Sequence, residues 1–444
     1  MTNKNLVLCK KIGSPIKRNI IANLFGIGVT LFTQIVLVPF YIYYWGNNLY
    51  SDWIVLTALT AFFSMSDIGL NTVTQNRFSI LLAQNKKNEC DSLLANNILI
   101  VSIIFIVVLA VSLSYVSVFD LTKQMNIHTL NRTETNIVFL LLMCRVFIGM
   151  YSTIEDAIFR ATHNASKATY FNQYANLAVA VITLMMLMLN NSMVFICAAI
   201  CLPHLVLIIF KHWYSQRLYR YTFSFKDIDF KLLRNIATPS LSFLSFPLGN
   251  AIILQGYSLV INNFFGADSV VVYNTTRTMC NFIKTLLASV QSSVWPEYSI
   301  SYGKLDYPRM RYLHRKTIKV AVLLSVVISV FLMIAGPVIY DIWTHSQIPF
   351  DRKLMSAFLV VLFIENLWSS SSVALLATNN HSHLGLFYVV TSVISLACAG
   401  FIGNKSSMPV IVLTTLFMQM PLCFYTLRAG FRLTKDRFRI SFRR

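Results

Sequence analysis

Apolar segments long enough to cross a bilayer constrain this chain more than any other feature. A transmembrane helix needs about 20 consecutive, mostly apolar residues, and twelve segments of roughly that length can be drawn along the chain. They cover approximately residues 20–45, 52–76, 94–117, 135–158, 169–189, 192–210, 237–261, 268–294, 317–340, 354–378, 384–403 and 409–427. Their apolar runs are continuous and lack the alternation of a transmembrane β-strand. The sequence therefore predicts an all-α integral membrane protein with twelve transmembrane helices.

Composition and charge agree with a membrane protein. Of the 444 residues, 56% are hydrophobic and 12% are charged, against about 25% charged residues in a soluble domain. A net charge of +20 would suggest nucleic-acid binding in a soluble chain. Here the basic residues stand at the ends of apolar segments, where topology and anionic membrane lipids account for them better. Nucleic acid is therefore not an expected partner.

The basic residues also predict an orientation. If the N-terminus is cytoplasmic, 29 of the 37 lysines and arginines fall in cytoplasmic segments and five fall in outer loops. This asymmetry predicts that both termini are cytoplasmic. The basic N-terminal segment resembles that of a signal peptide, but the apolar run after it is too long and ends without a small-residue cleavage site. We expect an uncleaved first span.

Cysteine usage suggests neither disulfides nor a metal centre. The eight cysteines form no CxxC pair, and most lie in apolar segments, which favours buried, unpaired side chains. Cys197, Cys201 and His204 share a helix face, but no fourth ligand is visible. We expect neither a metal nor an organic cofactor, although coupling to H⁺ or Na⁺ stays open.

An internal repeat divides the chain into halves. Residues 161–166 and 377–382 share the pattern A-T-x-N-x-S at an offset of 216 residues. At an offset of 217, a polar stripe in the second span overlays one in the eighth; its members are Thr57, Thr60, Ser64, Asp67, Asn71 and Thr74. We infer two duplicated six-helix halves with the same orientation, an arrangement that places a substrate between the halves.

The predicted domains follow from this repeat. An N-terminal bundle covers 1–210 and a C-terminal bundle covers 237–427, joined by a basic cytoplasmic linker at 211–236. A basic cytoplasmic tail covers 428–444. The linker and the tail mix aromatic or aliphatic residues with lysine and arginine, a pattern typical of segments at headgroup level.

The stripe in the eighth span carries two cations. Its members step by three or four residues and so lie on one helix face; they are Asn274, Arg277, Asn281, Lys284, Ala288 and Gln291. A cation facing lipid at mid-membrane costs at least ~2.5–3.5 kcal/mol. Arg277 and Lys284 must therefore face a polar cavity or a partner, and simple contacts between helices are the alternative.

Other ionisable residues lie within predicted spans. Arg145 in the fourth span would join Arg277 and Lys284 in an electropositive lining, which suits an anionic, amphiphilic substrate such as a lipid phosphate. Asp67 and Glu365 could pair with a cation or carry a coupling ion. The gate candidates lie near the inner end of the fourth span, where they could equally form a solvated rim; they are Glu155, Asp156 and Arg160.

Catalytic motifs are missing from the sequence. It contains no GxGxxG, P-loop, HExxH or Gly-x-Ser-x-Gly pattern, so we expect no enzyme. Without a nucleotide site, transport would be driven by an ion gradient, the membrane potential or the substrate gradient.

Three passages resemble one family. They are FSMSDIGL at 63–70, FFGADSVVVY at 264–273, where the glycine marks a turn between the seventh and eighth spans, and SVWPEYS at 293–299. Together they resemble the polysaccharide repeat-unit (O-antigen) flippases, Wzx-like members of the multidrug/oligosaccharidyl-lipid/polysaccharide (MOP) exporter superfamily. Members often have an acidic residue in the seventh span, whereas this chain offers only Gln255. That departure argues against ion coupling in this span.

The resemblance implies a MATE-like V of two six-helix bundles around a cationic cavity in a bacterial inner membrane. The implied substrate is an undecaprenyl-pyrophosphate-linked oligosaccharide, moved to the periplasmic leaflet, with a polymerase and a chain-length regulator as partners. The three cations would then hold the pyrophosphate. Polar side chains would hydrogen-bond the sugar, and we expect these to be Asn274, Asn281, Gln291, Thr57, Thr60, Ser64 and Asn71.

Three other functions are conceivable. A multidrug antiporter of the same fold would favour an acidic, aromatic pocket, and the cationic lining argues against it. A membrane polysaccharide polymerase would usually carry a large outer loop, and the loops here are short. A non-transport scaffold would leave the buried cations unexplained.

Overall fold

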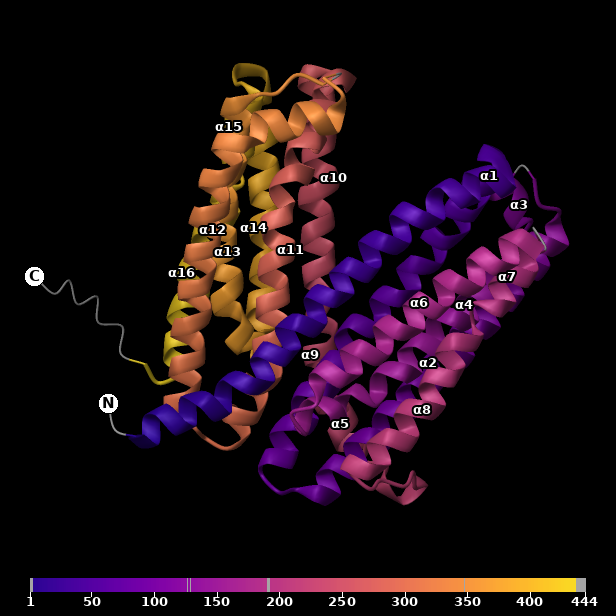
Figure 1. The fold of residues 1–444 in the computed structure, drawn as a ribbon, viewed down its shortest axis with the longest axis vertical. Helices are drawn as coiled ribbons and strands as arrows, with labels where there is room; N and C mark the ends of the chain where they lie inside the picture. Colours follow the sequence, from indigo (N-terminus) through magenta and orange to yellow (C-terminus); the bar gives the residue numbers. More distant parts are fainter. Residues whose placement is uncertain (1–2, 126, 128, 190–191, 347, 437–444) are drawn as a thin grey trace, which may run out of the picture. The chain divides into compact units, whose positions relative to one another are not determined.

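A computed structural model describes residues 3–125, 127, 129–189, 192–346 and 348–436. Within helices, it describes the backbone but not the side chains of residues 3–14, 34, 47, 61–68, 225, 230–235, 237 and 267. The described elements are α-helices and two short 3₁₀ helices, with no strand among them (Figure 1). The all-α fold predicted from the sequence is confirmed. The chain divides into two compact units, Met1–Ser240 and Leu241–Arg444.

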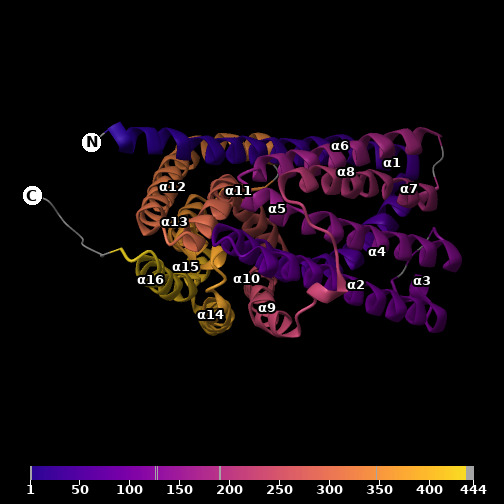
Figure 2. The same ribbon diagram turned by 90° about the horizontal axis from the view of Figure 1, so that it is seen from below.

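Unit 1 contains the first half of the repeat. Its elements are α1 (Asn3–Ala83), α2 (Lys87–Val118), α3 (Leu121–Gln124), α4 (Arg132–Ile154), α5 (Asp156–Ala161), α6 (Ala165–Leu189), α7 (Met193–Ala199), α8 (Leu202–Leu218), η1 (Phe225–Asp227) and most of α9 (Phe230–Phe243). Helices α6 and α8 lie side by side in both ribbon views, and α1 packs against α4 and α6 (Figures 1 and 2). These helices are the walls of the site described below.

Local sequence signals set several helix ends. Gly46 has φ 69° and ψ 175°, a conformation open to glycine because it lacks a Cβ, and it separates the two spans that α1 contains. Asn131 and Glu134 form a reciprocal capping box at the start of α4, which satisfies two otherwise unpaired backbone donors. In unit 2, Gly266 with φ 81° separates α10 from α11, where the sequence predicted a glycine turn.

Unit 2 contains the second half of the repeat. Its elements are α10 (Ser245–Phe265), α11 (Ala267–Gly303), α12 (Tyr307–Thr344), α13 (Arg352–Ala377), α14 (Ser382–Ile402), η2 (Gly403–Lys405), α15 (Met408–Leu413) and α16 (Leu416–Leu433). Helix α13 is central and packs against α11, α12 and α16. The serine side chains at 369–372 are small and let neighbouring helices approach closely. Ser370 and Ser371 have no exposed surface.

The helices are long and apolar enough for repeated membrane crossing. Within the described residues, ten helices meet length and hydropathy criteria for a membrane span. The two further predicted spans, 52–76 and 268–294, are helical parts of α1 and α11 and carry the two polar stripes. The chain is therefore a multi-pass membrane protein. The cytoplasmic position of both termini stays a prediction.

The predicted repeat recurs in backbone geometry. His163 and Asn379, 216 residues apart, both adopt φ 59° in the turns after α5 and α13. One residue later in each turn, the side-chain amides of Asn164 and Asn380 donate to the threonine hydroxyl two residues earlier, at 3.3 and 3.1 Å. The two copies of the A-T-x-N-x-S pattern therefore form the same turn, and the duplication itself stays a prediction.

The segment predicted as a linker, 211–236, overlaps helices at both of its ends. Helix α8 continues through Leu218, and α9 begins at Phe230. In between, the hydroxyl of Tyr219 donates to Asp91 at 2.6 Å. Burial, followed by the hydrogen bond and charge of Asp91, raises the pKa of Tyr219. Tyr219 therefore stays a protonated donor and ties the start of this connection to α2.

Candidate functional site

A pocket of about 430 Å³, lined by both polar and apolar side chains, lies within unit 1. Residues of α1, α4, α6 and α8 line it: Thr57, Thr60, Leu142, Arg145, Val146, Gly149, Met150, Ser152, Thr153, Asn172, Asn176 and His204. Three residues from the sequence predictions, Arg145, Thr57 and Thr60, meet here. Among these described lining residues, Arg145 is the only lysine or arginine, and there is no aspartate or glutamate.

Arg145 keeps its donors available to a ligand. Its side chain is half-buried, and no carboxylate of the described residues lies within ion-pair distance of it. The imidazole of His204 also lies in the lining. Thr60 is buried, and its hydroxyl donates to the Thr57 carbonyl at 3.0 Å. The pocket thus combines one cation with neutral polar groups.

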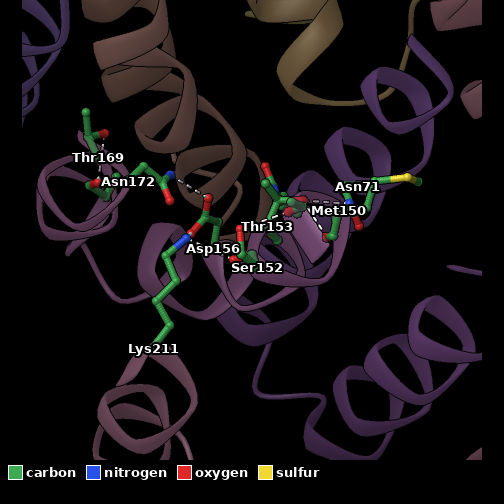
Figure 3. Close-up of polar contacts among 11 residues, drawn as sticks. Asn71, Met150, Ser152, Thr153, Asp156, Thr169, Asn172 and Lys211 are labelled. Atoms are coloured by element: carbon green, nitrogen blue, oxygen red, sulfur yellow. Dashed lines mark hydrogen bonds and ion pairs between the residues drawn. The ribbon is translucent and has the colours of Figure 1, made fainter. Parts of the chain in front are cut away.

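Asn71 does not line this pocket. Its amide donates to the Met150 carbonyl at 3.1 Å and to the Thr153 hydroxyl at 2.7 Å (Figure 3). Its oxygen accepts from Asn97 at 2.7 Å. These bonds hold α1 against α4 and α2. The side chain predicted to bind sugar is therefore committed to helix packing, as buried polar groups usually are.

A buried ion pair adjoins the pocket. The Lys211 ammonium lies 2.7 Å from Asp156 Oδ1 and donates to the Ser152 carbonyl at 2.8 Å (Figure 3). Asn172 reaches the second oxygen of Asp156 at 3.5 Å. Ser152 and Asn172 also line the pocket, so two lining residues hydrogen-bond directly to the ion pair.

The gate candidates contact α8 in two places. Asp156 pairs with Lys211, and the next residue of α8, His212, has its Nδ1 2.9 Å from Glu155. Arg160 forms no ion pair with a described residue. Sequence reasoning missed Lys211 because it assigned this residue to a loop. The signal was present, since Lys211 stands seven residues after His204 and continues its helical face.

In unit 2, the two stripe cations have different surroundings. Arg277 donates to the Leu254 carbonyl at 3.0 Å and lies 5.3 Å from the Tyr273 ring, with no carboxylate partner among the described residues. Lys284 lies 2.6 Å from Glu365 Oε1, with side chains 36% and 17% exposed. The charge of Lys284 is therefore already balanced, whereas that of Arg277 is not.

The amides of the stripe partly serve helix contacts. Gln291 donates to Ser369 and Ser370, both at 3.0 Å, and joins α11 to α13. Asn274 accepts from Ser258 of α10 at 3.3 Å. The half-buried Asn281 has no side-chain hydrogen bond within the described residues. The alternative interpretation, contact between helices, applies to Gln291 and Asn274.

Two predicted site residues belong to a part of α1 of which only the backbone is described. The side chains of Asp67 and Ser64 lie outside the described residues. Their pairing and exposure stay predictions.

The comparisons with known proteins bear on the family. No family model matches the chain. A Salmonella typhi protein described as a candidate O-antigen transporter is 24% identical over 353 residues, which cover 78% of this chain and 79% of that protein.

Solved structures share the whole fold. An outward-facing multidrug resistance MATE family transporter of the MOP superfamily aligns with a TM-score of 0.76 at 14% identity, over 94% of this chain and 96% of the other. The chain has the MOP fold. A MOP superfamily transporter from Pyrococcus furiosus gives a TM-score of 0.73 at 14% identity, over 95% and 96% of the two chains. A Vibrio cholerae MATE transporter in its bent form gives 0.75 at 14% identity, over 96% and 98%.

The resemblance to MOP exporters that the sequence predicted is confirmed by these comparisons. A place in a bacterial inner membrane agrees with the bacterial relatives of the same fold. At these identities the structural matches establish the MOP fold and leave the substrate to the residues of this chain.

Proposed function

We propose that this chain is a flippase for undecaprenyl-pyrophosphate-linked oligosaccharide repeat units. It would move them from the cytoplasmic to the periplasmic leaflet by alternating access. The observation that carries the proposal is the unit 1 pocket, in which Arg145 stands among neutral polar groups without an acidic side chain in the described lining. The 24% identical candidate O-antigen transporter supports the same substrate class.

The chemistry of the pocket suits a phosphate group. An arginine guanidinium donates two parallel hydrogen bonds to phosphate oxygens. In a site of low dielectric constant, the attraction between the guanidinium and the phosphate is only weakly screened. Around Arg145, the amides of Asn172 and Asn176 and the hydroxyl of Thr60 match the hydroxyls of a sugar. A volume of about 430 Å³ is within the range of small-molecule sites, so the pocket would take part of the head group.

Unit 2 would supply further contacts. Arg277 has no carboxylate partner, and Asn281 has no side-chain hydrogen bond, among the described residues; both are proposed to contact the head group. Glu365, which is paired with Lys284, and Asp67 are the proposed positions for a coupling H⁺ or Na⁺. A polymerase and a chain-length regulator are proposed partners that would consume the translocated units.

The main rival is a multidrug antiporter with the same fold. Such a carrier binds cationic compounds, which Arg145 would repel across the pocket. Drug efflux that persists in Arg145→Gln, with no defect in polysaccharide export, would favour this rival.

The test replaces the pocket cation. Arg145→Gln should lower repeat-unit translocation at least tenfold, because one charge-assisted hydrogen bond contributes about 1.5–3 kcal/mol. Surface polysaccharide, normalised to the amount of protein in the membrane, is the measurement. Arg132→Gln is the matched control, because Arg132 lies exposed in the first turn of the same helix. Wild-type polysaccharide in Arg145→Gln would contradict the proposal.

A further inference from the structure

The exposed face of α12 begins with a row of cations. Arg311, Arg315 and Lys319 stand at intervals of four residues, and Lys316 lies beside them. With Pro308 and Tyr312, these four residues line a surface recess of about 570 Å³. The positive-inside rule accounts for the number of basic residues at a helix end. It does not account for their alignment along one face of α12, where they line a recess.

The charge of this recess is mostly unbalanced. Arg315 makes two hydrogen bonds to Asp436, at 2.7 and 2.6 Å. Arg311 and Lys319 have no carboxylate partner among the described residues. Lys316 donates to the Tyr312 hydroxyl at 3.2 Å, a contact that leaves its charge uncompensated. Three positive charges therefore lie within about two helical turns.

The same helix face continues as an apolar stripe. Leu323, Val326, Val330 and Ile334 follow the cations at steps of three or four residues, and each is at least 46% exposed. Val326, Val330 and Ile334 also line a second recess, of about 490 Å³, against Leu359 and other residues of α13. A headgroup-sized cationic recess thus leads along one face into an apolar groove.

The length of α12 places these two parts at different depths. Its 38 residues span about 57 Å at 1.5 Å per residue, whereas the hydrocarbon core of a bilayer is about 30 Å thick. With the apolar stripe in the hydrocarbon, the cations stand at headgroup level. Lysine and arginine at that level attract anionic lipids.

We propose that this face of α12 binds an anionic phospholipid of the surrounding bilayer. The phosphate lies among Arg311, Lys316 and Lys319, and an acyl chain follows Leu323 to Ile334 into the groove against α13. This site lies on a different helix from the pocket and the stripe assigned to the transported lipid. It does not depend on the proposed function.

The test measures lipid binding to the purified full-length protein. Native mass spectrometry in detergent compares dioleoyl phosphatidylglycerol with dioleoyl phosphatidylcholine, which has the same acyl chains. We expect tighter binding of phosphatidylglycerol. In Arg311→Gln/Lys319→Gln its affinity should fall about thirtyfold, since each cation near an anionic lipid surface contributes about fivefold. Arg352→Gln/Lys353→Gln, which neutralises two exposed cations at the start of α13, should retain wild-type affinity.

Several outcomes would overturn the proposal. These are an equal loss in both double variants, no loss in either, a preference for undecaprenyl pyrophosphate over phosphatidylglycerol, or equally tight binding of soluble glycerol phosphate. If the first double variant does not fold, Lys319→Gln replaces it, since this exposed side chain has no hydrogen bond with a described residue. That variant should lose about fivefold in affinity, and an unchanged affinity counts against the site.

Discussion

Lys211 has no exposed surface, although a lysine ammonium is among the costliest groups to remove from water. Asp156 and the Ser152 carbonyl compensate for that loss. The pair joins α5 to α8, and its neighbour, the contact between Glu155 and His212, joins the same region a second time. Two of the three gate candidates, Glu155 and Asp156, thus fasten α8 to the junction of α4 and α5 beside the pocket.

We predict that stability depends on the charge of Lys211. Lys211→Met should destabilise the protein by about 3–5 kcal/mol, because it leaves the Asp156 carboxylate buried without its partner. Thermal unfolding in detergent measures the change, with Lys226→Met at an exposed position of the connection to α9 as the control. The double variant Lys211→Met/Asp156→Asn should recover part of the loss, since no charge then stays unpaired. A Lys211→Met protein as stable as wild type would show that the pair contributes little.

Helix α10 packs against α14 through glycines. A Cβ built at Gly249 would lie 2.5 Å from Cδ1 of the Tyr388 ring, and one built at Gly256 would lie 2.5 Å from Cδ2 of Leu396. Small residues at such contacts let membrane helices approach closely. Tyr388 in turn packs against Trp368 of α13. The two glycines therefore set the distance between α10 and the rest of unit 2.

We predict that alanine substitutions at two glycines of these helices, Gly249 and Gly400, have different effects on stability. Gly249→Ala should destabilise unit 2 by about 1–3 kcal/mol, as overpacking of a well-packed contact does. Gly400→Ala on α14, where an added Cβ meets nothing within 4 Å, should not destabilise the protein and should stabilise it by up to about 1 kcal/mol, since alanine loses less backbone entropy than glycine in a helix. Unfolding in detergent compares the two variants. Equal effects would mean that the close approach at Gly249 is not retained in the folded protein.

For the whole molecule, the duplication and the charge asymmetry predict one topology. The two units carry the same turn, with φ 59° at His163 and Asn379, after helices that the sequence places in corresponding positions. An even number of spans in each half gives these turns the same side of the membrane. The excess of basic residues assigns that side to the cytoplasm.

Reporter fusions test this orientation. Alkaline phosphatase, which is active only outside the cytoplasm, should be active when fused after Lys123 and inactive when fused after Lys226. The reason is that basic residues are retained on the cytoplasmic side, where 29 of 37 are assigned. The reverse pattern would invert the topology, and activity at both positions would contradict the odd number of spans, three, predicted between the two sites.

The sequence alone determined the features that depend on neighbouring residues. Apolar runs of sufficient length specify membrane helices because a buried backbone must satisfy its hydrogen bonds internally. The backbone conformation at Gly266 follows from the absence of a Cβ, and its turn between α10 and α11 was predictable. The repeat was visible as a fixed offset, and Arg145 and Thr60 were identified as polar residues within apolar segments.

Tertiary structure alone decided which of the polar residues are free to bind. Asn71 and Gln291 have the spacing of pocket residues, yet both use their amides to join helices. Lys284 is balanced by Glu365, 81 residues away, whereas Arg145 has no such partner among the described residues. Periodicity shows which residues share a helix face. Which helix meets that face depends on packing between distant segments, and this packing separates the pocket cation from those already paired.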